Sequence, residues 1–290
     1  MRLAVRGTDG KPVHPPGAVG VVVQSPADYW HCYRVRFPDG FEASFHRQEL
    51  SILSHFKQPG AGGALAEYDL GHVIYRCVVG SRAYGLDTES SDTDRRGVYL
   101  PPAELHWSLY GVPEQLENAA TEETYWEIQK FLTMALKANP NVLECLYTPI
   151  VEHATPLARE MLGMRQGFLS KLVYQTYNGY VMSQFKKLQA DLRNHGQVKW
   201  KHVMHLIRLL LSGITALTEG FVPVHVGEHR ERLLAVKRGE VAWGEVEAWR
   251  LELHRRFDEA VVGTKLPERP DYGGANGLLI KARRSMVVLP

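Results

Sequence analysis

The chain has 290 residues, a hydrophobic content of 44% and a charged content of 23%, which are ordinary values for a folded globular protein. Its formal net charge of +2 neither indicates nor excludes a nucleic-acid partner. Residues 1–7 lack the apolar core of a signal peptide, and no apolar run approaches the length of a membrane span. Cys32, Cys77 and Cys145 are widely spaced. We therefore expect a protein of the reducing cytoplasm with no membrane partner.

Residues 1–58 contain short apolar or alternating runs separated by turn residues. Residues 19–23 and 33–37 have strand character, and Pro38, Asp39 and Gly40 are typical of a hairpin turn. We predict a small SH3-like β-barrel over residues 1–58. Such modules bind nucleic acids or peptides in some proteins and serve packing or oligomerisation in others. Residues 58–64 have the composition of a linker.

A second domain is predicted over residues 65–150. Residues 73–79 form an apolar strand that runs into Gly80 and Ser81, and residues 92–100 form a second strand. A short strand near residues 122–125 then leads into a helix with an apolar stripe. Residues 139–141 interrupt this helix, and Asn141 is expected to cap the next helix in a capping box with Glu144.

Residues 151–290 are predicted to form a helical C-terminal domain. Its clearest segment is residues 199–218, where apolar side chains recur at helical spacing. Further helices are expected around residues 231–236 and 241–261, and residues 283–290 are expected to be an extended tail. The fold class is α+β: a short mixed sheet with helices, an N-terminal small β-barrel and a helical C-terminal domain.

The most informative segment joins Gly80 and Ser81 to Asp92 and Asp94. Residues two apart on a strand face the same side, with Cα atoms roughly 6.5 Å apart, so both carboxylates can hold divalent metal ions. Two such ions support in-line phosphoryl or nucleotidyl transfer. A P-loop is excluded because Leu86 stands where that motif needs Lys. A calcium loop fits poorly, and the remaining alternative is a polar hairpin turn.

Several motifs resemble the RNA-repair-pathway DNA polymerase β family of predicted nucleotidyltransferases. The match covers roughly residues 66–285, and the motifs that carry it occur in the order and spacing of that family. They are Gly80-Ser81-Arg82-Ala83-Tyr84-Gly85, Ser91-Asp92-Thr93-Asp94-Arg95-Arg96-Gly97-Val98, Lys130-Phe131, Asn139-Pro140-Asn141-Val142-Leu143-Glu144 and Lys201-His202-Val203-Met204-His205-Leu206-Ile207-Arg208. The resemblance implies a polymerase-β-type catalytic core and metal-dependent nucleotidyl transfer, plausibly to RNA ends in repair.

The resemblance also implies a set of metal ligands. Asp92 and Asp94 would bind two Mg²⁺ ions, with Mn²⁺ as an alternative. The superfamily usually supplies a third carboxylate, an Asp at the start of the third strand, which this chain lacks. Glu123 is our first candidate for that position and Glu122 the second, and Glu127 could instead reach back from the start of the following helix.

Phosphate-binding residues are expected on two elements. Ser81 and the backbone N–H groups near Gly80 would hold the β- and γ-phosphates. Arg82 is the best candidate for an additional cationic donor, ahead of Arg95 and Arg96. Lys201, His205 and Arg208 share one face of a helix, so we expect these three side chains to contact phosphate as well.

Three functions remain open at this point. The first is transfer of NMP from an NTP, ATP included, to an RNA end, perhaps that of a tRNA. The second is transfer of AMP to a protein side chain. The third is a catalytically weak nucleic-acid-binding protein in which the barrel and the basic residues between 186 and 208 do the binding. The sequence does not identify the preferred NTP, the acceptor or the oligomeric state.

Overall fold

The computed structural model divides the chain into two units, residues 1–62 and 63–290. The predicted linker at residues 58–64 falls outside the described residues. The structure describes residues 5–6, 12–14, 18–26, 28, 31–37, 39–50, 72–89, 91–109, 111–118, 121–195 and 198–287.

The N-terminal unit contains short antiparallel strands. Strands β1 (Val5–Arg6) and β2 (Pro12–His14) form one pair. Strands β3 (Val21–Gln24), β4 (Tyr33–Arg36) and β5 (Glu42–Phe45) form a three-stranded sheet, followed by the short helix η1 (Arg47–Glu49). Val35, Phe37 and Phe45 form its small core. The described residues of this unit show β-structure but no closed barrel, so the SH3-like architecture stays a prediction.

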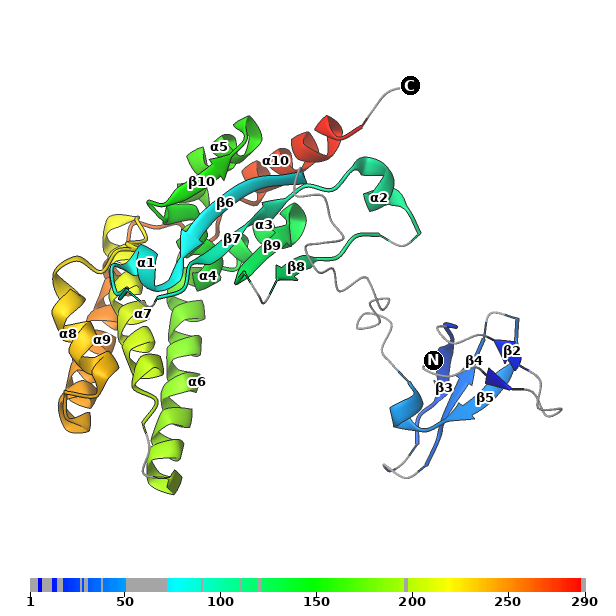
Figure 1. Cartoon of the computed structure of the whole chain (residues 1–290), viewed down its shortest axis with the longest axis horizontal. Coiled ribbons are helices and arrows are strands. Elements are labelled where there is room, and N and C mark those ends of the chain that lie inside the picture. Colours follow the sequence, from blue (N-terminus) through cyan, green and yellow to red (C-terminus); the bar gives the residue numbers. More distant parts are fainter. Residues whose placement is uncertain are drawn as a thin grey trace. The chain divides into compact units, whose positions relative to one another are not determined.

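The second unit is built on a mixed five-stranded sheet in the order β10-β6-β7-β9-β8 (Figure 1). Only β7 and β9 run parallel; the other neighbouring strands are antiparallel. The strands are β6 (Val73–Val79), β7 (Asp94–Tyr99), β8 (Gln115–Asn118), β9 (Glu123–Glu127) and β10 (Val151–Ala154). Strand β7 begins at Asp94, so Asp92 lies in the segment before it rather than in the strand.

Short helices connect and cover this sheet. They are α1 (Gly80–Tyr84), α2 (Ala103–Trp107), α3 (Ile128–Leu136), α4 (Pro140–Tyr147), α5 (Pro156–Gly163) and η5 (Arg165–Phe168). Helix α4 begins after Asn139, whose side chain accepts hydrogen bonds from the N–H groups of Asn141 and Val142. The capping box predicted for Asn141 and Glu144 is therefore wrong. Pro140 supplies the first helical residue, for which its fixed φ is well suited.

The C-terminal helices differ in length, and three of them pack around one central helix. The C-terminal helices are α6 (Leu172–His195), α7 (Trp200–Glu219), η6 (Gly227–His229), α8 (Arg230–Arg238), α9 (Trp243–Gly263) and α10 (Tyr272–Ser285). Helix α7 contacts α6, α8 and α9. Helix α10 packs against α3, so the extended tail predicted from residue 283 is wrong at least through Ser285.

One hydrophobic core joins the sheet to these helices. Val98 and Trp126 of the sheet belong to the same buried cluster as Phe131 of α3 and Ile207 of α7. The opposite face of the sheet carries a much smaller cluster of Val73, Tyr99, Leu116 and Tyr125. Strand β10 lies beyond the boundary predicted at residue 150, so the sheet and the helices are parts of one packed unit. The mixed α+β class is confirmed.

Candidate active site

The site begins where β6 ends and the chain turns sharply at Gly80. Val79, the last residue of β6, pairs with Asp94, the first residue of β7. Gly80 has a φ of +73°, a conformation that glycine adopts without steric cost. A Cβ at Gly80 would lie 2.2 Å from Oδ2 of Asp94, so the Asp94 carboxylate lies directly against the Gly80 backbone. The antiparallel register thus places the carboxylate beside the glycine-serine turn.

A pocket of about 610 Å³ opens at this turn, and Asp92 and Asp94 both line it together with Gly80 and Ser81. Asp94 also lies 3.4 Å from Arg96, another residue of the pocket wall. The two carboxylates and the glycine-serine turn can therefore contact one common ligand. This was the central geometric expectation from the sequence.

Arg82 does not line this pocket but holds the segment that carries Asp92. Its guanidinium donates hydrogen bonds to the backbone carbonyls of Ser91, at 2.7 Å, and Asp92, at 3.3 Å. The structure thus gives Arg82 a structural contact in place of the expected phosphate contact. Arg95 is also directed elsewhere, because it pairs across β6 with Glu152 on strand β10.

Basic side chains line the pocket from two helices. Lys201 and His205 come from α7, and Lys237 comes from α8. Lys237 donates a hydrogen bond to the backbone carbonyl of Leu86, which lies just after the glycine-serine turn. The pocket therefore combines the Asp92 and Asp94 carboxylates with two ammonium groups, an arrangement suited to a metal-bound polyphosphate.

His205 is a neutral member of this basic group. Burial lowers its pKa to about 4, and the positive charges of Arg208 and Lys201 lower it in the same direction. At neutral pH the imidazole therefore offers a neutral hydrogen-bonding group rather than a charge. Its ring lies edge-on to Tyr84, with the ring centroids 6.1 Å apart.

Arg208 lies deeper than its helical spacing suggested and does not line the pocket. Its Nη1 is 2.7 Å from Oε1 of Glu144, in an ion pair whose two side chains are each less than a tenth exposed. The guanidinium also lies 3.7 Å from the centre of the Tyr84 ring, and the Tyr84 hydroxyl donates to Glu144 at 2.6 Å. The prediction that Arg208 contacts phosphate in this pocket is therefore wrong. The residue instead ties α7 to α1 and α4 below the pocket.

The predicted third carboxylate is absent from the pocket because of the register of β9. Glu123 pairs with Arg95, and residues paired in a sheet share a face. That face is opposite the one occupied by Asp94, and Glu123 accepts a hydrogen bond there from the Tyr125 hydroxyl. The assignment of Glu123 as the third metal ligand is wrong on this geometry.

Neither alternative for the third carboxylate reaches the pocket. Glu122 has a φ of +53°, and its backbone carbonyl accepts a hydrogen bond from Arg96. Glu127 is buried, caps α3 through the N–H of Gln129 and pairs with Arg283 of α10. Glu144 does line the pocket, but its carboxylate is held by Tyr84 and Arg208. Asp92 and Asp94 are thus the two carboxylates available for a metal ion among the described residues that line the pocket.

These two residues fit a Mg²⁺ ion that is bound together with its substrate. Among the described residues no group of three or more His, Cys, Asp or Glu side chains is placed to hold a metal ion. Mg²⁺ is commonly bound by one or two carboxylates together with substrate phosphates and water, rather than by an all-protein cage. The close approach of Asp94 to Gly80 places a carboxylate beside the backbone where a phosphate would lie.

Several pocket residues could not be identified from local motifs. Lys237 follows Asp94 by more than a hundred residues and has no motif around it. Tyr84 and Glu144 lie within the family motifs, but their sequence did not indicate that they pair. Asn141 and Trp126 also line the pocket, and the Trp126 indole donates to Gln115 on β8.

A model of the RNA repair pathway DNA polymerase beta family (RlaP) matches residues 55–281. The chain belongs to this family. The description of the family is that of a DNA polymerase β-type group assigned to an RNA repair pathway. The matched region contains the entire sheet and every residue of the pocket described above.

Among curated proteins, the chain is similar to "Uncharacterized protein YcgL" of Bacillus subtilis (strain 168). The two are 26% identical over 154 residues, which span 52% of this chain and 58% of the relative. No solved structure matches the chain. None of the helices in the described ranges combines the length and apolarity needed to cross a membrane.

Proposed function

We propose that this protein transfers NMP from an NTP to the end of an RNA, with Mg²⁺ as the metal. The observation that carries the proposal is the contact between the Asp94 carboxylate and the Gly80 turn, in a pocket that Asp92 also lines. In this proposal the carboxylate would be a metal ligand and the turn a phosphate cradle, so that metal and phosphate would bind side by side. The family supports nucleotidyl transfer in RNA repair, while the metal, the preferred NTP and the acceptor belong to the proposal.

We assign separate roles to the residues that line the pocket. Ser81 and the backbone N–H groups of the Gly80 turn would bind the terminal phosphates, since such groups form a concave site for anions. Lys201 and Lys237 approach from the helices and would neutralise the triphosphate. His205, which is neutral, would offer a hydrogen bond to the triphosphate without adding charge. These residues would orient the α-phosphate toward the acceptor.

Asp92 and Asp94 would hold the metal, and two ions remain the expected number. When bound, the metal would neutralise charge on the phosphates and lower the pKa of the acceptor hydroxyl. In the transfer, the hydroxyl oxygen of the acceptor forms a bond to the α-phosphorus, loses its proton and displaces pyrophosphate. The protein's part is to position the two substrates and to stabilise the developing charge.

The experiment is incubation with α-labelled NTPs, Mg²⁺ and either RNA or cell protein. We expect label on RNA in the wild type and none with the double variant Asp92→Asn and Asp94→Asn, whose fold should be intact. Glu123→Gln is the matched control, because it removes one carboxylate charge from the opposite face of the sheet. It should keep nearly full activity.

Three outcomes would contradict the proposal. Label on protein but never on RNA would indicate AMP transfer to a protein side chain. RNA binding without incorporation of any nucleotide would indicate a nucleic-acid-binding protein. Unchanged turnover in the Asp92 and Asp94 double variant would refute the metal assignment.

A further inference from the structure

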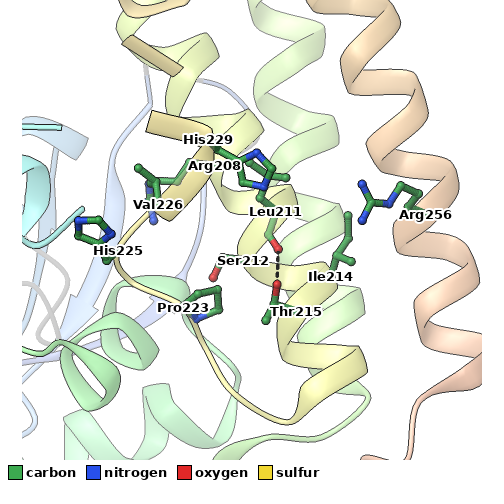
Figure 2. A pocket seen from close by; sticks show the side chains of 10 residues that line it. All are labelled: Arg208, Leu211, Ser212, Ile214, Thr215, Pro223, His225, Val226, His229 and Arg256. Atoms are coloured by element: carbon green, nitrogen blue, oxygen red, sulfur yellow. Dashed lines mark hydrogen bonds between the residues drawn. The ribbon is translucent and has the colours of Figure 1, made fainter. Parts of the chain in front are cut away.

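A second, smaller cavity is lined by Arg208, whose ion-pair partner Glu144 lines the first pocket. The volume of this second cavity is about 140 Å³, and α7, α9, η6 and the segment before η6 form its walls (Figure 2). Four of the residues that line it are basic: Arg208, His225, His229 and Arg256. None of its described lining residues is acidic. A cavity with this lining favours an anion.

Arg208 lines this cavity and also carries a buried donor that has no acceptor. The side chain is 7% exposed, and its Nη1 is used by Glu144. Its Nε is buried and has no hydrogen-bond partner among the described residues. A buried donor without a partner destabilises the fold, and more so when the group is charged. The buried hydroxyl-bearing residue Ser212 lines the same cavity.

Arg256 and His229 add donors from two further elements. Figure 2 shows the Arg256 guanidinium extending from α9 toward the cavity. The adjacent residue Arg255 is held by Glu252 and Glu259, whereas no such ion pair engages Arg256 within the described part of the chain. His225 is occupied differently, because its Nδ1 accepts a hydrogen bond from the N–H of Gly227. His229 Nε2 lies 3.9 Å from a carboxylate oxygen of the adjacent Glu228, beyond hydrogen-bond distance. Arg208, Arg256 and His229 can therefore each donate to a ligand.

We propose that this cavity binds a small oxyanion of the phosphate class and that Arg208 couples the bound anion to the first pocket. Since a water molecule occupies about 30 Å³ of liquid, the cavity has room for one phosphate-sized ion or a few waters. Guanidinium groups form strong, charge-assisted hydrogen bonds to phosphate oxygens. Such an anion would provide the acceptor that Arg208 Nε lacks.

The coupling follows from the two partners of Arg208. Glu144 and Tyr84, which Arg208 contacts, both line the first pocket. An anion at Nε would share the charge of the guanidinium with Glu144 and alter the support of α1, on which Ser81 lies. Thermodynamic linkage then requires that NTP and the anion change each other's affinity by the same factor. Binding to the second cavity does not depend on the activity proposed for the first.

The test is calorimetric titration of the full chain with inorganic phosphate and, separately, with pyrophosphate. The starting protein carries Lys201→Ala and Lys237→Ala, so that binding in the first pocket is suppressed. We expect saturable binding of at least one of the two anions. In this background, Arg256→Ala with His229→Ala should weaken binding at least tenfold. Arg255→Ala is the matched control and should leave the affinity unchanged.

Two results would overturn the proposed anion site, and a third would overturn the coupling. Absence of saturable binding in the starting protein would show that the cavity holds only water. Equal losses with the Arg255 and Arg256 substitutions would show that the anion binds to the general positive charge of α9. The coupling is measured in the wild-type protein as a change in the dissociation constant of an NTP when the anion is saturating. An unchanged constant would refute the role of Arg208 as a link.

Discussion

Replacing Gly80 with Ala should separate the chemistry of the site from the stability of the fold. Gly80 has a φ of +73°, which costs a residue with a Cβ about 1–2 kcal/mol. The new Cβ would also lie 2.2 Å from Oδ2 of Asp94, about 1.2 Å short of ordinary van der Waals contact. The carboxylate must therefore move away from the turn by roughly that distance. A displacement of about 1 Å at reacting groups can cost about 100-fold in rate.

Gly111→Ala is the matched control for this substitution. Gly111 has a φ of +61°, and nothing lies within 4 Å of the position of its Cβ. The Gly111→Ala substitution therefore imposes the same kind of backbone strain without changing any contact in the site. We expect both variants to lose about 1–2 kcal/mol of stability. Only Gly80→Ala should also lose about 100-fold in activity.

The assay combines denaturant unfolding with Mg²⁺-dependent incorporation of labelled NTP, and NTP binding in the presence of Mg²⁺ gives a second readout. If the activity of Gly80→Ala stays within about threefold of that of Gly111→Ala at equal stability, activity does not depend on the contact between the Asp94 carboxylate and the glycine-serine turn. Our account of the site would then be incorrect. If both variants lose activity equally, the loss reflects backbone strain alone and the reasoning again fails.

Three further predictions concern the helical side of the pocket. Lys201→Ala and Lys237→Ala should each raise the dissociation constant of the NTP about tenfold or more, because a hydrogen bond to a charged group contributes about 1.5–3 kcal/mol. The constants are measured by titration calorimetry, and an unchanged constant for both variants would show that the triphosphate binds elsewhere. Glu144→Gln should lower the free energy of unfolding by about 3–5 kcal/mol, because the substitution leaves the charge of Arg208 buried without its ionic partner. A loss below about 1 kcal/mol, measured by urea unfolding, would contradict the stabilising role of the buried ion pair. The pKa of the His205 imidazole is about 6.5 in the unfolded chain and about 4 in the folded protein, so protonation favours unfolding as the pH falls through this window. Between these limits the free energy of unfolding of the wild type should fall by about 3 kcal/mol more than that of His205→Asn. Equal pH profiles for the two proteins would contradict the burial of this group.

The part of the site that the sequence could predict depends on local geometry. Gly80 directly follows β6, and Asp94 begins the adjacent antiparallel strand β7. Because only α1 and a short loop separate the two strands, a local motif is enough to predict that these residues meet. The glycine-serine turn and the Asp92 and Asp94 pair therefore come together in the structure as expected. The α+β class followed from the same alternation of short strands and apolar helical stripes.

The predictions that were wrong concern side chains whose positions depend on tertiary packing. The pairing of Glu123 with Arg95 sets the face that Glu123 occupies, and a shift of one residue would reverse it. Helical periodicity placed Arg208 on the same face as Lys201, but it could not show that Glu144 and Tyr84 hold it deeper. Lys237 reaches the pocket through the packing of α8 on α7, which no local pattern indicates.

The most direct test of the central claim is a crystal structure with Mn²⁺ and a non-hydrolysable NTP analogue. We predict an anomalous peak in contact with carboxylate oxygens of both Asp92 and Asp94, at about 2.2 Å, with a phosphate oxygen as a further ligand. The terminal phosphates should lie against Gly80 and Ser81 and face Lys201. A metal ion that contacts neither carboxylate, or a triphosphate bound away from the glycine-serine turn, would contradict the account.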